Sequence, residues 1–173
     1  DLDTAQEDLD VLTSLDVYDV LVFHYTVGEI SNEQRDGLSK WLAGGKGFVG
    51  IHSAADSFRG DPDFRNLVGG HFITHPRHRE YQVSVKDAEH PIMAGIEEEF
   101  MVVDEQYITD YDPRVHVLAS ALWKGDAMPV AWTKNHGEGR VFYQALGHDP
   151  HACEHAVFRQ MLVQGTKWAA NVV

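Results

Sequence analysis

The chain has 173 residues, 43% of them hydrophobic, and a formal net charge of −13 from 14 Lys and Arg against 27 Asp and Glu. This length and hydrophobic content predict one domain, residues 1–173, with room for a sizeable core. The negative charge repels phosphate groups, so we expect no nucleic acid and no membrane among the partners. The single cysteine, Cys153, excludes an internal disulfide and a zinc site built from several cysteines.

Export and membrane insertion are not indicated by the sequence. No apolar run approaches the roughly 20 residues that span a bilayer, and there is no signal-peptide pattern. We therefore predict a cytoplasmic protein. The chain starts at Asp1 without a methionine, and residues 1–16 contain no convincing strand and helix of the kind that opens a parallel sheet. We accordingly leave open that the domain lacks its N-terminal strand and helix.

A strand, a helix and a second strand are predicted near the start of the chain. Residues 18–24 form an apolar run rich in β-branched and aromatic side chains, which indicates a central parallel strand buried on both faces. Ser31 and Gln34 resemble a capping box, and the helix that they open should end at the glycine pair 44–45. Residues 47–52 form a second buried strand. This succession predicts a βαβ unit with two parallel strands.

The rest of the chain adds strands and a final helix. Residues 62–68 predict a short helix, and residues 129–133 and 140–145 flank a glycine-bearing turn that is typical of a hairpin. The other segments predict strands at 80–86, 100–103 and 115–119 and a helix at 154–170. The expected architecture is one α/β domain.

Two of the eleven histidines follow strand ends, which is where ligands bind in an open α/β sheet. His52 closes the strand at 47–51, and His148 follows the strand at 140–145. Each is either a functional group or a hydrogen-bonded turn residue, and the pattern alone leaves both open. Residues 50–54 have the strand-to-turn shape of a nucleophile elbow, but with His52 in place of Ser or Cys, which argues against an acyl-enzyme.

Six motifs, in order along the chain, resemble the trehalose-utilisation (ThuA-like) family. They are residues 47–56 (GFVGIHSAAD), 67–72 (LVGGHF), 90–92 (HPI), 104–107 (DEQY), 129–132 (PVAW) and 139–149 (GRVFYQALGHD). The resemblance runs from about residue 18 to 170. It implies a class I glutamine-amidotransferase-like fold, that is, a flavodoxin-like doubly wound, mostly parallel sheet, with an antiparallel hairpin extension.

The same resemblance implies a role in carbohydrate metabolism. It places His52 where amidotransferases carry a catalytic Cys, and His148 and Asp149 near their His-x-Glu position, so glutamine hydrolysis is not expected. We expect instead a hydrolase or lyase that acts on a sugar or keto-sugar by acid–base chemistry. The alternative is a non-catalytic binding or assembly domain of the same fold, and a homo-oligomer is left open.

The candidate site residues fall into two groups. The predicted catalytic groups are His52 and His148, with Glu105 assisting and Asp149 orienting His148. The predicted contacts to a small carbohydrate are the polar and aromatic side chains nearby in these motifs or in the following loop: Ser53, Asp56, His71, His75 and Tyr107.

No metal is assigned from the sequence, and a divalent metal is left open as a cofactor. His71 and His75 are four residues apart, with His78 nearby, a spacing that chelates a metal if the segment is helical. Pro76 and the preceding glycine pair favour a loop instead, and a site assembled from His52, His148 and one of these three is an alternative. Residues 151–155 match a zinc-protease pattern, His-x-x-Glu-His, but a solvated first turn of a helix explains them better.

Overall fold

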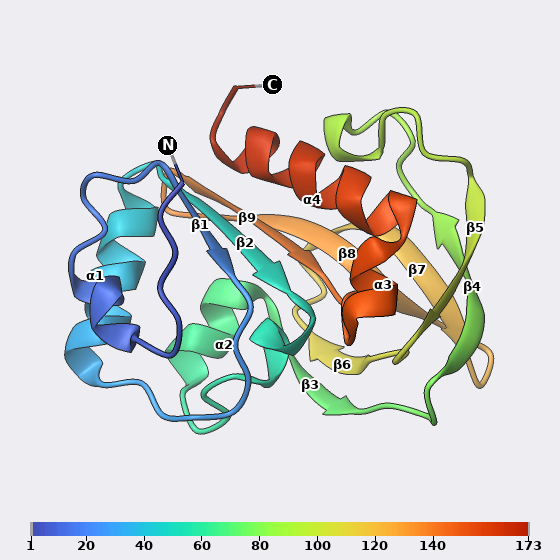
Figure 1. The fold of residues 1–173 in the computed structure, drawn as a ribbon, viewed down its shortest axis with the longest axis horizontal. Helices are drawn as coiled ribbons and strands as arrows, with labels where there is room; N and C mark the ends of the chain where they lie inside the picture. Colours follow the sequence, from blue (N-terminus) through green and yellow to red (C-terminus); the bar gives the residue numbers. More distant parts are fainter. Residues whose placement is uncertain (1, 173) are drawn as a thin grey trace.

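The computed structural model describes residues 2–172, which form a seven-stranded sheet and a separate two-stranded sheet (Figure 1). The strand order of the large sheet is β1-β2-β9-β8-β7-β4-β5, and β3 pairs with β6 in the small one. The strands are β1 Val20–Phe23, β2 Gly47–Ile51, β3 Gly70–Thr74, β4 Arg79–Val85, β5 Glu99–Asp104, β6 Ile108–Tyr111, β7 His116–Trp123, β8 Asp126–His136 and β9 Gly139–Gln144.

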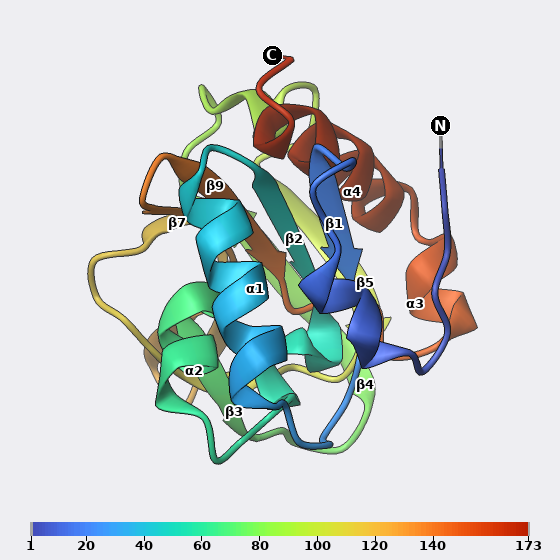
Figure 2. The same ribbon diagram turned by 90° about the vertical axis from the view of Figure 1, so that its left-hand side faces the viewer.

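Helices lie on both faces of the parallel end of the large sheet (Figure 2). The α-helices are α1 Asn32–Ala43, α2 Pro62–Val68, α3 Pro150–Glu154 and α4 Ala156–Ala169, and the 3-10 helices are η1 Leu9–Thr13, η2 His52–Asp56 and η3 Pro91–Met93. Helices α1 and α2 cover one face and α4 covers the other. Within residues 2–172, no helix is both long and apolar enough to cross a bilayer.

The large sheet is parallel at one end and antiparallel at the other. Strands β1, β2 and β9 run parallel, whereas each pair from β9 through β8, β7 and β4 to β5 is antiparallel. The α/β class is therefore confirmed, but the mostly parallel sheet that the resemblance implies is found only in these three strands. The physical reason is that no α-helix separates the strands from β4 to β9, and a parallel pair needs a long crossover.

Two hydrophobic cores lie on opposite faces of the parallel strands. Phe48 of β2 and Tyr143 of β9 belong to the core beneath α1 and α2, whereas Val49 and Phe142 belong to the core beneath α4. Because successive side chains of a strand point to opposite faces, these strands are buried on both sides. This confirms the interpretation of the apolar run at 47–52. The run at 18–24, predicted to be a central strand buried on both faces, instead forms β1 at the edge of the sheet, where Val22 is exposed.

The local helix signals are confirmed with small shifts. The Ser31 hydroxyl accepts a hydrogen bond from the Gln34 backbone N–H, and the Gln34 side chain accepts one from the Ser31 N–H, so the capping box is complete. The predicted helix at 154–170 begins only at Ala156, because His155 has extended backbone angles and separates α3 from α4. His151 and His155 therefore do not share one helix, and the zinc-protease spacing is not realised.

The segment at 70–74, expected to be a loop, is a strand. It forms β3, which pairs antiparallel with β6. His71 lies in this strand and His75 follows its end, so the helical spacing that would bring both to one metal ion is absent. Nothing local indicates β3, because its partner lies more than 30 residues further along the chain.

Candidate active site

His52 stands in a strained turn directly after β2. Its φ of +44° lies in the left-handed region that residues other than glycine rarely adopt, and the residue is buried. The Tyr143 hydroxyl donates a hydrogen bond of 2.8 Å to the His52 carbonyl oxygen, which anchors the turn to β9. The turn thus has the geometry that the elbow pattern predicts, with an imidazole in the nucleophile position.

The ring of His52 is held in one tautomer. Its Nδ1 lies 2.7 Å from the carbonyl oxygen of Ala145, and a carbonyl oxygen only accepts, so Nδ1 carries the hydrogen. Burial lowers the pKa of His52 to about 4, against the opposing effects of the Ala145 carbonyl and Glu105, so the ring is neutral at pH 7. Its Nε2 therefore presents a lone pair, 3.5 Å from Oε2 of Glu105.

Glu105, the residue after β5, is the centre of a cluster of three histidines. Nδ1 of His148 lies 3.1 Å from Oε2 of Glu105, and Nε2 of His75 lies 3.5 Å from Oε1. The three rings come from the residues that follow β2, β3 and β9, far apart in sequence. The structure thus brings together His52, His148, Glu105 and His75, four of the residues that the sequence singled out.

The buried carboxylate of Asp104 fixes the backbone beneath this cluster. Oδ1 accepts hydrogen bonds from the N–H groups of Glu105 (2.7 Å) and His148 (3.2 Å), and Oδ2 accepts one from Gly147 (2.7 Å). Burial raises the pKa of Asp104, and these three N–H groups oppose the shift. Gly147 has a φ of +110°, and a Cβ there would meet the Phe158 ring at 2.7 Å, so the turn that carries His148 requires glycine.

Tyr107 and the polar residues of η2 lie at the buried side of the cluster. The Tyr107 ring packs on that of His52 with 4.0 Å between centroids, and burial raises the pKa of its phenol, which stays protonated. Ser53 is buried, with its carbonyl accepting from Ser57. Asp56 is held by Nε and one terminal nitrogen of Arg59, at 2.7 and 2.9 Å. These two hydrogen bonds satisfy both carboxylate oxygens of Asp56, whose contact with a carbohydrate stays a prediction.

Two other predicted residues have contacts outside the Glu105 cluster. Nδ1 of His71 lies 3.9 Å from a carboxylate oxygen of Asp110, its neighbour across the β3–β6 pair. Asp149 caps α3 by accepting from the Ala152 N–H, and its other oxygen lies 3.4 Å from Nε2 of His78. The ion-pair partner of the His148 ring is Glu105, so the orienting role of Asp149 stays a prediction.

The cluster is buried on the side of His52 and Glu105 and exposed to solvent on the side of His75 and His148. The His52 and Glu105 side chains are 4% and 13% exposed, whereas those of His75 and His148 are 35% and 42% exposed. A ligand can therefore approach the two outer histidines while the inner pair is shielded from water. Such a combination suits proton transfer, because imidazole and carboxylate groups are the commonest acid–base catalysts.

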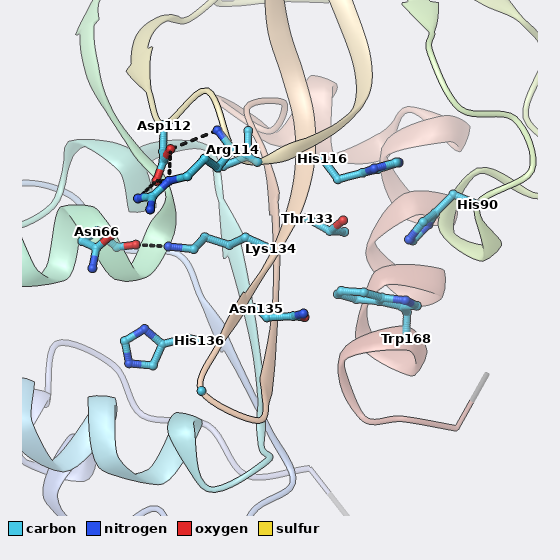
Figure 3. Close-up of a pocket in the computed structure, with 12 residues that line it drawn as sticks. Asn66, His90, Asp112, Arg114, His116, Thr133, Lys134, Asn135, His136 and Trp168 are labelled. Carbon is cyan, nitrogen blue, oxygen red and sulfur yellow. Dashed lines mark hydrogen bonds and ion pairs between the residues drawn. The ribbon is translucent and has the colours of Figure 1, made fainter.

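A cavity of about 670 Å³ lies away from this cluster (Figure 3). It is lined by residues 133–137, His116 and Trp168 among others, at the turn end of the β8–β9 hairpin. The cluster is at the opposite end of β9, about six residues or 20 Å away along the strand. We base the candidate active site on the Glu105 cluster, because the chemically matched groups converge there and not in the cavity.

The sequence did not identify the supports of the cluster. In the sequence, Asp104 is recognisable only as one of two adjacent carboxylates. No sequence pattern indicates the roles of the Ala145 carbonyl and the Tyr143 hydroxyl. A backbone carbonyl has no sequence signal, and the part played by Asp104 depends on the approach of β5 to the turn after β9.

The comparisons with known proteins agree with the fold. A ThuA-like protein from Parabacteroides merdae superposes with a TM-score of 0.83 at 20% identity, over 96% of this chain and 75% of that chain. A ThuA-like protein from Bacteroides uniformis superposes with a TM-score of 0.79 at 22% identity, over 95% of this chain and 75% of that chain. A GMP synthase component from Thermoplasma acidophilum superposes with a TM-score of 0.58 at 16% identity, over 93% of this chain and 77% of that chain.

At these identities the superpositions show the fold alone, and among curated proteins none matches the chain by sequence. The family model described as trehalose utilisation matches residues 1–169. The chain, with its imidazole at the elbow, belongs to the ThuA family.

Proposed function

We propose that this protein is an enzyme of carbohydrate metabolism that acts on a sugar or keto-sugar through the Glu105 cluster. The observation that carries the proposal is the convergence of three imidazole rings on one largely buried carboxylate, at 3.1 to 3.5 Å. Membership of a family described as trehalose utilisation supports a carbohydrate as the substrate. Glutamine hydrolysis is not proposed, because His52 occupies the elbow and the only cysteine, Cys153, lies in α3.

The chemistry that suits the cluster is elimination from a keto-sugar. An outer histidine, His75 or His148, removes the proton from the carbon beside the ketone, and the resulting enolate expels the glycosidic oxygen from the next carbon. Glu105 passes a proton between the histidines and the departing oxygen. Asp104 accepts a hydrogen bond from the Glu105 backbone N–H, and Nε2 of His52 accepts one from the Glu105 carboxyl group while that group carries the proton. Addition of water to the product would give net hydrolysis, so a lyase and a hydrolase share these first steps.

The fold assignment can also be refined. We propose that β1, β2 and β9, with helices on both faces, are the flavodoxin-like, doubly wound part of a class I glutamine-amidotransferase-like fold. The likeness to the GMP synthase component supports this. A cytoplasmic location stays a prediction from the sequence, and the formation of a homo-oligomer stays open.

The test is turnover of trehalose and of a keto derivative of trehalose, followed by chromatography of the released monosaccharides. We expect cleavage of the keto derivative, and a loss of about 100-fold or more in kcat/KM in the His148→Ala and His75→Ala variants. His136→Ala, which removes an imidazole bonded to Ser39 far from the cluster, should keep the wild-type rate. Binding without turnover would favour the non-catalytic alternative, and unchanged rates in both variants would remove the cluster from the mechanism.

A further inference from the structure

Nε2 of His52 faces Glu105 with no hydrogen between them. The Ala145 carbonyl at 2.7 Å takes the ring hydrogen on Nδ1, so Nε2 holds a lone pair directed at a carboxylate oxygen 3.5 Å away. A charged imidazolium–carboxylate pair would close to about 2.7–2.9 Å. Two electron-pair donors facing each other inside a protein are stabilised by a cation between them.

The spacing of the donor atoms fits such a cation. Ligands at about 2.0–2.2 Å from a tetrahedral ion lie about 3.3–3.6 Å from one another. Oε2 of Glu105 lies 3.5 Å from Nε2 of His52 and 3.1 Å from Nδ1 of His148, and one ligand atom from each of the three residues lies within 4.8 Å of the others. The His148 side chain is 42% exposed, so binding the same ion as His52 would require only a movement of a side chain at the surface.

The surroundings have the features of a metal centre that is open to substrate. Ligating histidines usually donate their other N–H to a backbone carbonyl or carboxylate, as Nδ1 of His52 does to Ala145. Asp104 binds the backbone N–H groups of the other two ligand residues, Glu105 and His148. The exposed side of the cluster leaves coordination positions for a substrate oxygen, as in catalytic sites with two histidines and one glutamate.

We propose that His52, Glu105 and His148 bind a divalent transition-metal ion. Two imidazoles and one carboxylate favour Zn²⁺ or Fe²⁺ over Mg²⁺ and Ca²⁺, which prefer oxygen ligands. This inference rests on the proposed function for its purpose: the ion would polarise the carbonyl of a keto-sugar. Because His148 would then bind the ion, His75, 3.5 Å from the other oxygen of Glu105, would be the histidine that removes the proton.

The metal is tested without any substrate. Protein stripped with a chelator is dialysed against Zn²⁺, or against Co²⁺ as a coloured substitute, and the bound metal is counted by mass spectrometry. We expect one ion per chain, a visible Co²⁺ absorption, and no comparable binding of Mg²⁺. His148→Ala and Glu105→Gln should weaken binding by about 100-fold or more, and His136→Ala should bind as the wild type does.

His148 is the more informative variant, since its side chain is exposed and its loss is not expected to unfold the domain. Stoichiometry well below one ion, or Zn²⁺ affinity unchanged in His148→Ala and Glu105→Gln, would overturn the metal assignment. Turnover of a keto-sugar by chelated protein would overturn it as well, and would leave the proposed function standing. Stoichiometric metal binding without any turnover would leave the metal site standing and remove the proposed function.

Discussion

Asp104→Asn is expected to damage both stability and the site, because one buried carboxylate accepts three backbone hydrogen bonds. An amide has one accepting oxygen and one NH₂ group. If the oxygen replaces Oδ1, the NH₂ faces the Gly147 N–H, and in the other orientation it faces the N–H groups of Glu105 and His148. Either way, at least one buried N–H loses its acceptor and meets a second donor.

The magnitude follows from the number of bonds lost. A hydrogen bond to a charged group contributes about 1.5–3 kcal/mol, and an unsatisfied buried N–H costs about 1–3 kcal/mol. The substitution also removes a buried charge, and the desolvation cost of that charge no longer opposes folding. This cost is the reason why burial raises the pKa of Asp104. We therefore expect the free energy of unfolding to fall by about 2–3 kcal/mol, which a domain stable by about 5–15 kcal/mol survives.

Urea unfolding followed by circular dichroism measures this loss. Asp126→Asn, which removes an exposed charge at the start of β8, is the matched control and should stay within about 0.5 kcal/mol of the wild type. Because the turn that carries His148 loosens, Asp104→Asn should also bind Zn²⁺ about 10 to 100 times more weakly. An Asp104→Asn protein as stable as the control would refute the assigned role of the three N–H groups.

Three further changes test the structure away from substrate. Gly165→Ala should lower the free energy of unfolding by about 1–3 kcal/mol in urea, because the new Cβ would lie 2.2 Å from Cδ1 of the buried Phe142 ring. Ser31→Ala should cost about 1 kcal/mol in the same assay, because the Gln34 N–H loses its cap. With a chelator present, the contribution of His52 to the free energy of unfolding should be constant above about pH 6.5. It should fall by about 3 kcal/mol as the pH is lowered to 4.

The sign of the pH effect comes from the depressed pKa of the folded state. Unfolded His52 takes up a proton near its ordinary pKa of 6.5, whereas the folded ring does so only at about 4, so acid favours the unfolded chain between these values. His52→Gln should lack this component, and an identical pH dependence in the two proteins would contradict it. A Gly165→Ala protein more stable than the wild type would show that α4 is free to move away from the sheet, and unchanged stability in Ser31→Ala would show that the cap is dispensable.

The sequence by itself determined the features that depend on neighbours along the chain. The capping box at Ser31, the helix Pro62–Val68 and the doubly buried strand Gly47–Ile51 follow from side chains within a few residues of one another. Strand-end positions also singled out His52 and His148, because the carboxyl ends of parallel strands meet at one edge.

Only the tertiary structure decided which distant groups meet. The β3–β6 pair joins residues 70–74 to 108–111, and it places His75 beside Glu105, although no local pattern favours a strand there. The tautomer of His52 depends on the carbonyl of Ala145, 93 residues further along the chain. The position of the His148 backbone depends on its hydrogen bond to Asp104 of β5. Hydrogen bonds across a folded chain depend on its three-dimensional path, so the sequence predicted the candidate histidines, and the fold decided that they surround one carboxylate.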